Sequence, residues 1–148
     1  MTTLKEGDKA PAISGIDQSG KPISLDQYKG KKVILYFYPK DATPGCTAQA
    51  CNLRDHYDSL TTAGYDVIGV SPDNEKSHQK FIEKQGLPFR LIADTDTSLA
   101  HAYGVWGPKK FMGKEYDGIH RTTFIINNGI IERVITKVDT KNHVSQIR

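Results

Sequence analysis

The sequence contains few cysteines, no block of like charge and no long hydrophobic segment. Only two of its 148 residues are cysteines, and 20 basic residues against 17 acidic ones give a net charge of +3. Charges spread in this way do not form the concentrated basic surface typical of nucleic-acid binding. The longest apolar run, residues 33–38, is far shorter than the ~20 residues that cross a bilayer. We therefore expect neither a nucleic-acid nor a membrane partner.

Cofactor and targeting motifs are also missing. The sequence has neither the GxGxxG pattern of dinucleotide-binding folds nor a P-loop, so we expect no cofactor. Residues 1–13 lack the apolar segment of a secretory signal, which predicts a cytoplasmic protein. In a reducing compartment, two neighbouring cysteines are more typical of metal-binding or redox sites than of a permanent disulfide.

The residues that are present predict one globular domain spanning residues 1–148. Hydrophobic residues make up 37% of the chain and charged residues 25%, which suits a single buried core. The apolar patterns predict, in chain order, a hairpin over 11–25, a strand at 33–38, a helix at 47–63, a strand at 65–70, a helix at 74–85, a strand at 89–93, a short helix at 97–103, and a hairpin of strands 121–126 and 130–138. This alternation indicates an α/β fold with a mixed central sheet flanked by helices.

Both cysteines lie in the stretch YPKDATPGCTAQAC, residues 38–51, and several interpretations are open for them. A structural zinc site needs four ligands, and no histidine lies at ligand spacing from either cysteine, so any zinc site would have to be assembled across the fold. No CxxC motif is present, so a thioredoxin-type exchange motif is absent. A pair of small buried residues is a further possibility, which suits Cys51 better than Cys46.

The spacing of Cys46 and Cys51 limits any disulfide between them. Within one helix, five residues give a rise of about 7.5 Å, and the two Cα atoms lie about 8.5 Å apart. A disulfide needs Cα atoms within about 7 Å, so either the first turn opens when the bond forms, or no bond forms. Cys46 follows Thr-Pro-Gly at the expected start of the helix, where free backbone N–H groups and the helix dipole favour a thiolate.

Specific segments of the chain match a known family. Pro39, Thr43 and Cys46 fit the Pro-x-x-x-Thr-x-x-Cys motif of the peroxiredoxins, and the stretch YFYPKDATPGCTAQAC resembles their bacterioferritin comigratory protein, or PrxQ, branch. Residues 104–107, 111–114 and 116–121 are similar to the same branch, in the same order. The resemblance covers nearly the whole chain and implies a thioredoxin-like fold with an N-terminal β-hairpin extension.

The resemblance also implies a thiol peroxidase that reduces hydrogen peroxide and organic hydroperoxides. By position, Cys46 is the peroxidatic nucleophile, and Cys51 is the resolving cysteine that forms an intramolecular disulfide with it. Thr43 and Arg121 orient the peroxide and stabilise the thiolate, while Pro39 shields the pocket. The disulfide would be reduced by thioredoxin or a similar dithiol protein. The branch includes monomers and dimers, and we expect a monomer here.

Two other functions would use the same features. A peroxide sensor would pass oxidation to a partner through a mixed disulfide, and a thioredoxin-fold binding module would leave both cysteines idle. Turnover with thioredoxin and a peroxide distinguishes a peroxidase from a sensor, because a sensor would be oxidised once and would not cycle rapidly. A Cys46→Ser variant tests the binding module, because unchanged peroxide consumption would show that Cys46 is not the nucleophile.

Outside the motif, the sequence gives weaker expectations. We expect Trp106 and Phe111 to be core or covering residues, and His56 and His120 to lie on the surface. Residues 105–118, rich in glycine and lysine, are expected to include a loop that borders the pocket. Residues 142–148 leave less room for a last helix than family members usually have, so the packing of that helix stays open.

Overall fold

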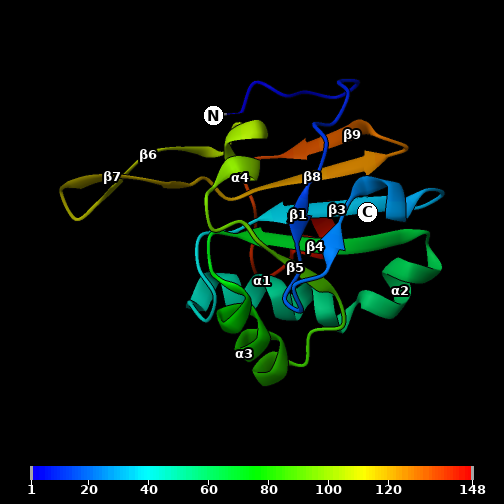
Figure 1. Cartoon of the computed structure of the whole chain (residues 1–148), viewed down its shortest axis with the longest axis horizontal. Coiled ribbons are helices and arrows are strands. Elements are labelled where there is room, and N and C mark those ends of the chain that lie inside the picture. Colours follow the sequence, from blue (N-terminus) through cyan, green and yellow to red (C-terminus); the bar gives the residue numbers. More distant parts are fainter. Residues whose placement is uncertain (1, 148) are drawn as a thin grey trace.

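Five strands form a mixed sheet at the centre of the molecule (Figure 1). The structure is a computed structural model that describes residues 2–147. In spatial order the strands are β5 (Arg90–Ala93), β4 (Tyr65–Ser71), β3 (Lys32–Phe37), β8 (Thr122–Asn127) and β9 (Ile130–Ile135). The pairs β3–β4 and β4–β5 are parallel, and β3–β8 and β8–β9 are antiparallel. The predicted mixed sheet is thereby confirmed.

Strand β3 is buried on both faces, as its continuous apolar run predicts. Its side chains alternate between two hydrophobic cores because successive residues of a strand point to opposite faces. Leu35 and Phe37 belong to one core, and Ile34 and Tyr36 belong to the other. The end of β3 therefore delivers the chain into the cysteine-containing stretch from a fixed position.

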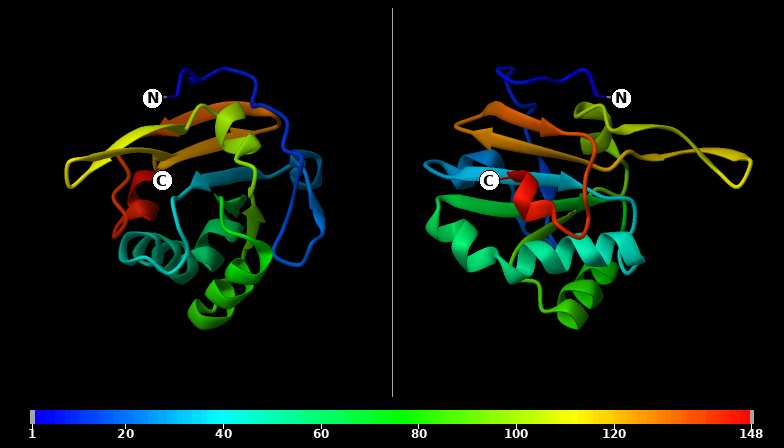
Figure 2. Two further views of the ribbon diagram at one scale, coloured as in Figure 1. Left: turned by 60° about the vertical axis from the view of Figure 1, so that its left-hand side comes forward. Right: turned by 180° about the vertical axis from the view of Figure 1, so that it is seen from behind.

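Helices cover one face of the sheet, and a helix with the N-terminal segment covers the other (Figure 2). The first group comprises α1 (Pro44–Asp55), α2 (Tyr57–Thr62), α3 (Glu75–Gln85) and α5 (His143–Ile147). The second comprises α4 (Ser98–Ala102), the short strands β1 (Gly15–Ile16) and β2 (Pro22–Ile23), and the 3-10 helix η1 (Leu25–Tyr28). Strands β1 and β2 pair as the predicted N-terminal hairpin. No helix within residues 2–147 is long and apolar enough to cross a membrane.

The predicted single helix over 47–63 is wrong in both its start and its continuity. Helix α1 begins at Pro44, because Thr43 has an extended backbone and proline is preorganised for the first helical position. The helix ends before His56, whose ring nitrogen Nδ1 lies 2.9 Å from the carbonyl oxygen of Asn52. That side chain engages the carbonyl that a continuing helix would offer to the amide of His56. Helix α2 follows as a separate element.

Residues 105–118 form a second hairpin in which β6 (Trp106–Phe111) pairs with β7 (Lys114–Ile119). The two strands extend away from the rest of the chain (Figure 1). Met112 and Gly113 turn the hairpin with φ of 52° and 80°, values in the left-handed region. The expectation of a core position for Phe111 is wrong, since 65% of this residue is exposed.

The other side-chain expectations have mixed outcomes. Trp106 is partly buried and stacks on His101, as a covering residue would. His56 is exposed, as predicted, but His120 is half-buried, with Nε2 lying 2.9 Å from the carbonyl oxygen of Pro108. The last helix, α5, is short and packs against α1.

Candidate active site

Cys46 is the third residue of α1 and lies in the first turn of the helix. Only 1% of the residue is exposed, and its side chain belongs to the core beneath α1. The first turn of a helix has backbone N–H groups without intrahelical partners, and the helix dipole places positive charge there. The first turn of α1 therefore presents N–H donors and positive potential on the side where the sulfur lies.

Arg121 brings a guanidinium to this sulfur from the residue just before β8. Its Nη2 donates to Cys46 Sγ at 3.2 Å, across 75 positions of sequence, and its Nη1 donates to Gln49 Oε1 at 2.7 Å. Gly45 leaves room for this approach, because a Cβ at that position would lie 3.3 Å from Arg121 Nη2. The structure thus brings together the two residues that the sequence predicts as nucleophile and cationic donor.

Two buried donors lie beside this pair, and the sequence predicted Tyr36 only as a strand-core residue that could line the pocket and gave Gln49 no role. Within the described chain, Tyr36 Oη and Gln49 Nε2 are buried polar atoms without a hydrogen-bond partner. Burial first, and then the negative charge of Cys46, raise the pKa of Tyr36 well above its ordinary value, so its hydroxyl keeps its proton. Gln49 could have been found from its helical spacing, because residues three apart on a helix are neighbours.

Thr43 and Pro39 lie at the two ends of the loop between β3 and α1. Thr43 is the residue before α1, and its Oγ1 donates to the carbonyl oxygen of Lys40 at 2.8 Å rather than toward the sulfur. Pro39 is half-buried and lines a cavity of about 330 Å³ at the base of the β6–β7 hairpin, together with Trp106 and Tyr116. Thr43 is thus three residues before Cys46 at the start of α1, whereas Pro39 faces the cavity.

Lys109, on β6, is a second cation that sequence analysis missed. Its Nζ donates to the carbonyl oxygen of Ile119 at 2.8 Å. Burial first, and then the positive charge of Arg121, lower the pKa of Lys109, while the charge of Cys46 acts in the opposite sense. Lys109 also lines the 330 Å³ cavity, whose lining includes neither Cys46 nor Arg121.

Cys51 lies in α1 with Cys46, and both are free thiols. Its Sγ donates to Gln85 Oε1, on α3, at 3.4 Å. Because α1 is one helix from Pro44 to Asp55, the two Cα atoms lie about 8.5 Å apart by helix geometry, beyond the reach of a disulfide. The structure therefore shows the reduced protein, in which α1 is one continuous helix.

The zinc interpretation finds no support at the cysteines. Across residues 2–147, the one group of three potential ligands close enough to share a metal ion is Asp41, Asp73 and His78, and neither cysteine belongs to it.

Comparison with known proteins identifies the family. Residues 6–134 match the AhpC/TSA family. Over 144 residues the chain is 49% identical to the Escherichia coli protein named peroxiredoxin Bcp, a match that covers 97% of this chain and 92% of that protein. This chain belongs to the peroxiredoxin family. The expectation drawn from the motif of Pro39, Thr43 and Cys46 is confirmed at the level of the family.

Solved structures connect this peroxiredoxin to the PrxQ branch. A cysteine-to-serine mutant of Xylella fastidiosa PrxQ superimposes with a TM-score of 0.92 at 28% identity, covering 99% of this chain and 94% of that one. The bacterioferritin comigratory protein of Xanthomonas campestris, described with alkyl peroxide reduction activity, gives a TM-score of 0.84 at 33% identity, covering 91% and 87%. The predicted thioredoxin-like fold is confirmed.

Proposed function

We propose that this peroxiredoxin is a thiol-dependent peroxidase that reduces hydrogen peroxide and organic hydroperoxides through Cys46. The main support is the buried contact of 3.2 Å between the Arg121 guanidinium and the Cys46 sulfur. Its relatives support the same activity, since they are named peroxiredoxins and one is described with alkyl peroxide reduction.

In the first step, the thiolate of Cys46 attacks the terminal peroxide oxygen. A sulfur–oxygen bond forms, the oxygen–oxygen bond breaks, and the leaving oxygen takes up a proton to become water or an alcohol. Negative charge moves from sulfur to that oxygen, so fixed donors aimed at it stabilise the transition state. Arg121 provides such donors while staying charged, and Tyr36 and Gln49 hold donor groups that no other residue uses.

The loop before α1 completes the proposed pocket. The Thr43 hydroxyl donates its hydrogen to the carbonyl oxygen of Lys40, so the hydroxyl oxygen can still accept a hydrogen bond from the peroxide. Pro39, which also lines the 330 Å³ cavity, is the residue that we expect to shield the pocket.

In the second step, Cys51 attacks the Cys46 sulfenic acid, which releases water and forms the Cys46–Cys51 disulfide. The first turn of α1 must open for the sulfurs to meet, because the wound helix holds the Cα atoms too far apart. A dithiol protein, for which thioredoxin is the proposed example, then reduces the disulfide by exchange. We expect the working form to be a monomer in the cytoplasm.

A peroxide sensor is the alternative use of the same two cysteines. The relatives do not favour it, because they are named for peroxidase chemistry.

The test is a turnover assay with thioredoxin, its reductase and NADPH, using hydrogen peroxide and an alkyl hydroperoxide in separate runs. The wild type should cycle, Cys46→Ser should consume no peroxide, and Cys51→Ser should be oxidised once without forming the internal disulfide. One rapid oxidation of the wild type without cycling would indicate a sensor. Peroxide consumption by Cys46→Ser at the wild-type rate would refute Cys46 as the nucleophile.

A further inference from the structure

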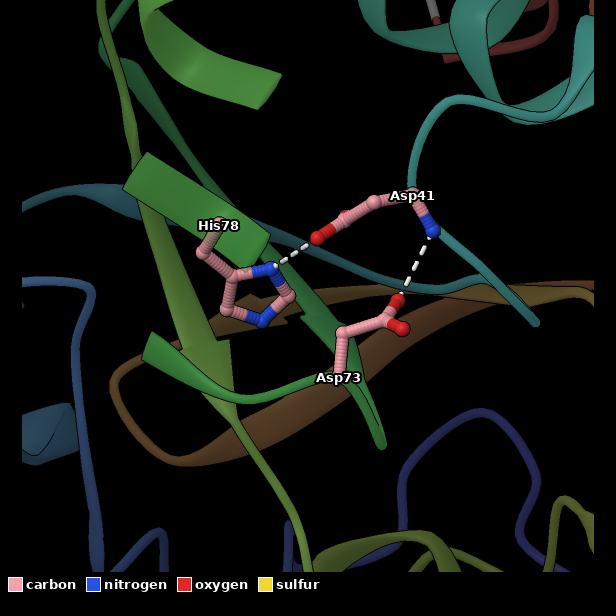
Figure 3. Close-up of side chains that lie close together, drawn as sticks. All are labelled: Asp41, Asp73 and His78. Atoms are coloured by element: carbon pink, nitrogen blue, oxygen red, sulfur yellow. Dashed lines mark hydrogen bonds and ion pairs between the residues drawn. The ribbon is translucent and has the colours of Figure 1, made fainter. Parts of the chain in front are cut away.

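A buried polar cluster lies between the loop that precedes α1 and the start of α3 (Figure 3). His78, on α3, has no exposed surface, and its Nδ1 lies 2.7 Å from Oδ2 of Asp41, which is 6% exposed. The other ring nitrogen, Nε2, lies 2.8 Å from the carbonyl oxygen of Ile92, on β5. A carbonyl oxygen only accepts, so Nε2 carries a hydrogen, and a second proton lies between Nδ1 and Asp41 in either charge state of the pair.

Asp41 makes three further hydrogen bonds, two through its carboxylate and one through its backbone N–H. Its Oδ1 accepts from the Tyr38 hydroxyl at 2.6 Å, and its Oδ2 accepts from Ser77 Oγ at 2.8 Å. Its backbone N–H donates to Asp73 Oδ2 at 2.7 Å (Figure 3). The ligand atoms of Asp41, Asp73 and His78 lie within 4.8 Å of one another, but these contacts already engage them. The cluster is therefore built to fix the backbone around Asp41.

The fixed backbone is the loop that leads into Cys46. Ala42 has a φ of 63°, a left-handed value that sterically disfavours any residue with a Cβ. Such a conformation persists only where its surroundings impose it. The bonds of Asp41 impose it on one side of Ala42, and the bond from Thr43 to Lys40 imposes it on the other.

Helix α3 also holds the far part of α1. Gln85, at the last turn of α3, accepts from Cys51 Sγ through its side chain, and its carbonyl oxygen accepts from Arg54 at 2.7 Å. One end of α3 therefore holds the loop before Cys46, and the other end holds the turn that carries Cys51.

We propose that Asp41 and His78 are positioning residues that latch the loop of residues 39–43 to α3 and so keep the first turn of α1 wound around Cys46. This inference rests on the proposed chemistry of Cys46 and Cys51. The latch favours the state that reacts with peroxide and opposes the opening that lets Cys51 reach the sulfenic acid. A sulfenic acid has two competing fates, condensation with a thiol or oxidation by a second peroxide to sulfinic acid. The latch therefore sets the partition between disulfide and sulfinic acid.

The test compares His78→Phe, which removes both ring-nitrogen contacts, with Asn74→Ala as a matched control. Asn74 caps the same end of α3 by accepting from the Ser77 amide at 2.9 Å, and among the described residues its side chain has no hydrogen bond to residues 39–43. In the reduced proteins, amide exchange of residues 39–47 should be about tenfold faster in His78→Phe, the scale expected for the loss of a buried hydrogen bond. Asn74→Ala should leave this loop unchanged.

The chemical readout is the product of a single oxidation by excess alkyl hydroperoxide. His78→Phe should oxidise Cys46 more slowly, close the disulfide about tenfold faster and give a smaller sulfinic fraction than the wild type, by the same scale of hydrogen-bond loss. His78→Asn, whose amide nitrogen can replace Nδ1 as donor to Asp41, should restore wild-type exchange and wild-type partition. Asp41→Ala, which removes the oxygens that contact Tyr38, Ser77 and His78, serves if His78→Phe does not fold.

The proposal is overturned if both latch variants leave loop exchange unchanged, or if the loop loosens while the sulfinic fraction stays at the wild-type value. Failure of the proposed function gives a different result. In that case the wild-type Cys46 itself is not oxidised, whereas the exchange measurement, made without peroxide, still reports on the latch.

Discussion

At the scale of single residues, the site depends on how Arg121 divides its donors. One nitrogen binds the Cys46 sulfur and the other binds the Gln49 amide oxygen. The planar guanidinium makes both contacts at once, whereas a lysine ammonium acts as a point charge on a flexible stem. The two contacts hold the charge in place before any peroxide binds.

Arg121→Lys should therefore lower the second-order rate constant for Cys46 oxidation by about 100-fold to 1000-fold, the range for loss of a preorganised donor. Stopped-flow mixing of the reduced protein with hydrogen peroxide measures this rate. Arg90→Lys is the matched control, since Arg90 pairs with Asp17 at the far edge of the sheet. A change of less than about twofold in Arg121→Lys would contradict the role of the guanidinium.

Sequence analysis locates these residues unequally, for physical reasons. The local motif shows Pro39, Thr43 and Cys46, which are close together in the chain. Arg121 lies 75 positions from Cys46, so only the resemblance to the family identifies it. Tyr36 is one of several aromatic residues in a buried strand, and nothing in the sequence shows that its hydroxyl lacks a partner.

At the scale of elements, helix α1 has two states in the proposed reaction. The reduced state is wound from Pro44 to Asp55 and holds both cysteines. Oxidation to the disulfide must open part of it. Helix content should therefore fall, and amide exchange over residues 46–54 should become faster, when the protein is oxidised. Identical exchange maps of reduced and oxidised protein would rule out this opening.

Helix α5 introduces a pH-dependent contribution to stability through His143. The residue is fully buried, with Nε2 lying 2.8 Å from Thr123 Oγ1 and Nδ1 lying 2.8 Å from Gln146 Oε1. Burial first, and then the positive charge of Arg121, lower the pKa of His143 below its ordinary value, against an opposing effect of Gln146. The unfolded chain therefore takes up this proton more readily than the folded one.

Acid should destabilise the protein through His143. As pH falls through the window between the ordinary value of about 6.5 and the lower folded pKa, the unfolded state binds more protons and stability is lost. This group accounts for at most about 1.4 kcal/mol per pH unit. His143→Asn should flatten the curve of unfolding free energy against pH, measured by urea denaturation. Parallel curves for the two proteins would contradict a lowered pKa.

Two features of the fold were mispredicted from the sequence patterns: the break between α1 and α2, and the β6–β7 hairpin. The break between α1 and α2 depends on a side-chain contact of His56, which apolar periodicity does not reveal. The strands β6 and β7 are largely exposed and lack the apolar alternation that predicts strands. Their pairing comes from the turn at Met112 and Gly113 and from backbone hydrogen bonds.

At the scale of the molecule, one sheet separates two hydrophobic cores that both depend on β3. We therefore expect one domain that unfolds in a single transition, and a monomer in solution. Urea unfolding followed by Trp106 fluorescence and by far-ultraviolet circular dichroism should give coincident curves, and sedimentation should give a mass near 16.5 kDa. Separate transitions would contradict the single domain, and a doubled mass would contradict the monomer.

Apart from β6, β7 and the break between α1 and α2, the order of strands and helices was predictable, because the buried strands have apolar runs and the helices have apolar residues at helical spacing. The way in which β3, α1, α3 and β8 converge on Cys46 was not, because tertiary packing brings those segments together. The family resemblance supplied the missing long-range information for Arg121 but not for Asp41 and His78.

The most direct test of the proposed chemistry is mass mapping of the wild type after one equivalent of alkyl hydroperoxide, with free thiols blocked before digestion. We expect a peptide in which Cys46 and Cys51 are joined, with the loss of two hydrogens. Recovery of both cysteines as blocked thiols, while the hydroperoxide remains intact, would contradict the proposed function.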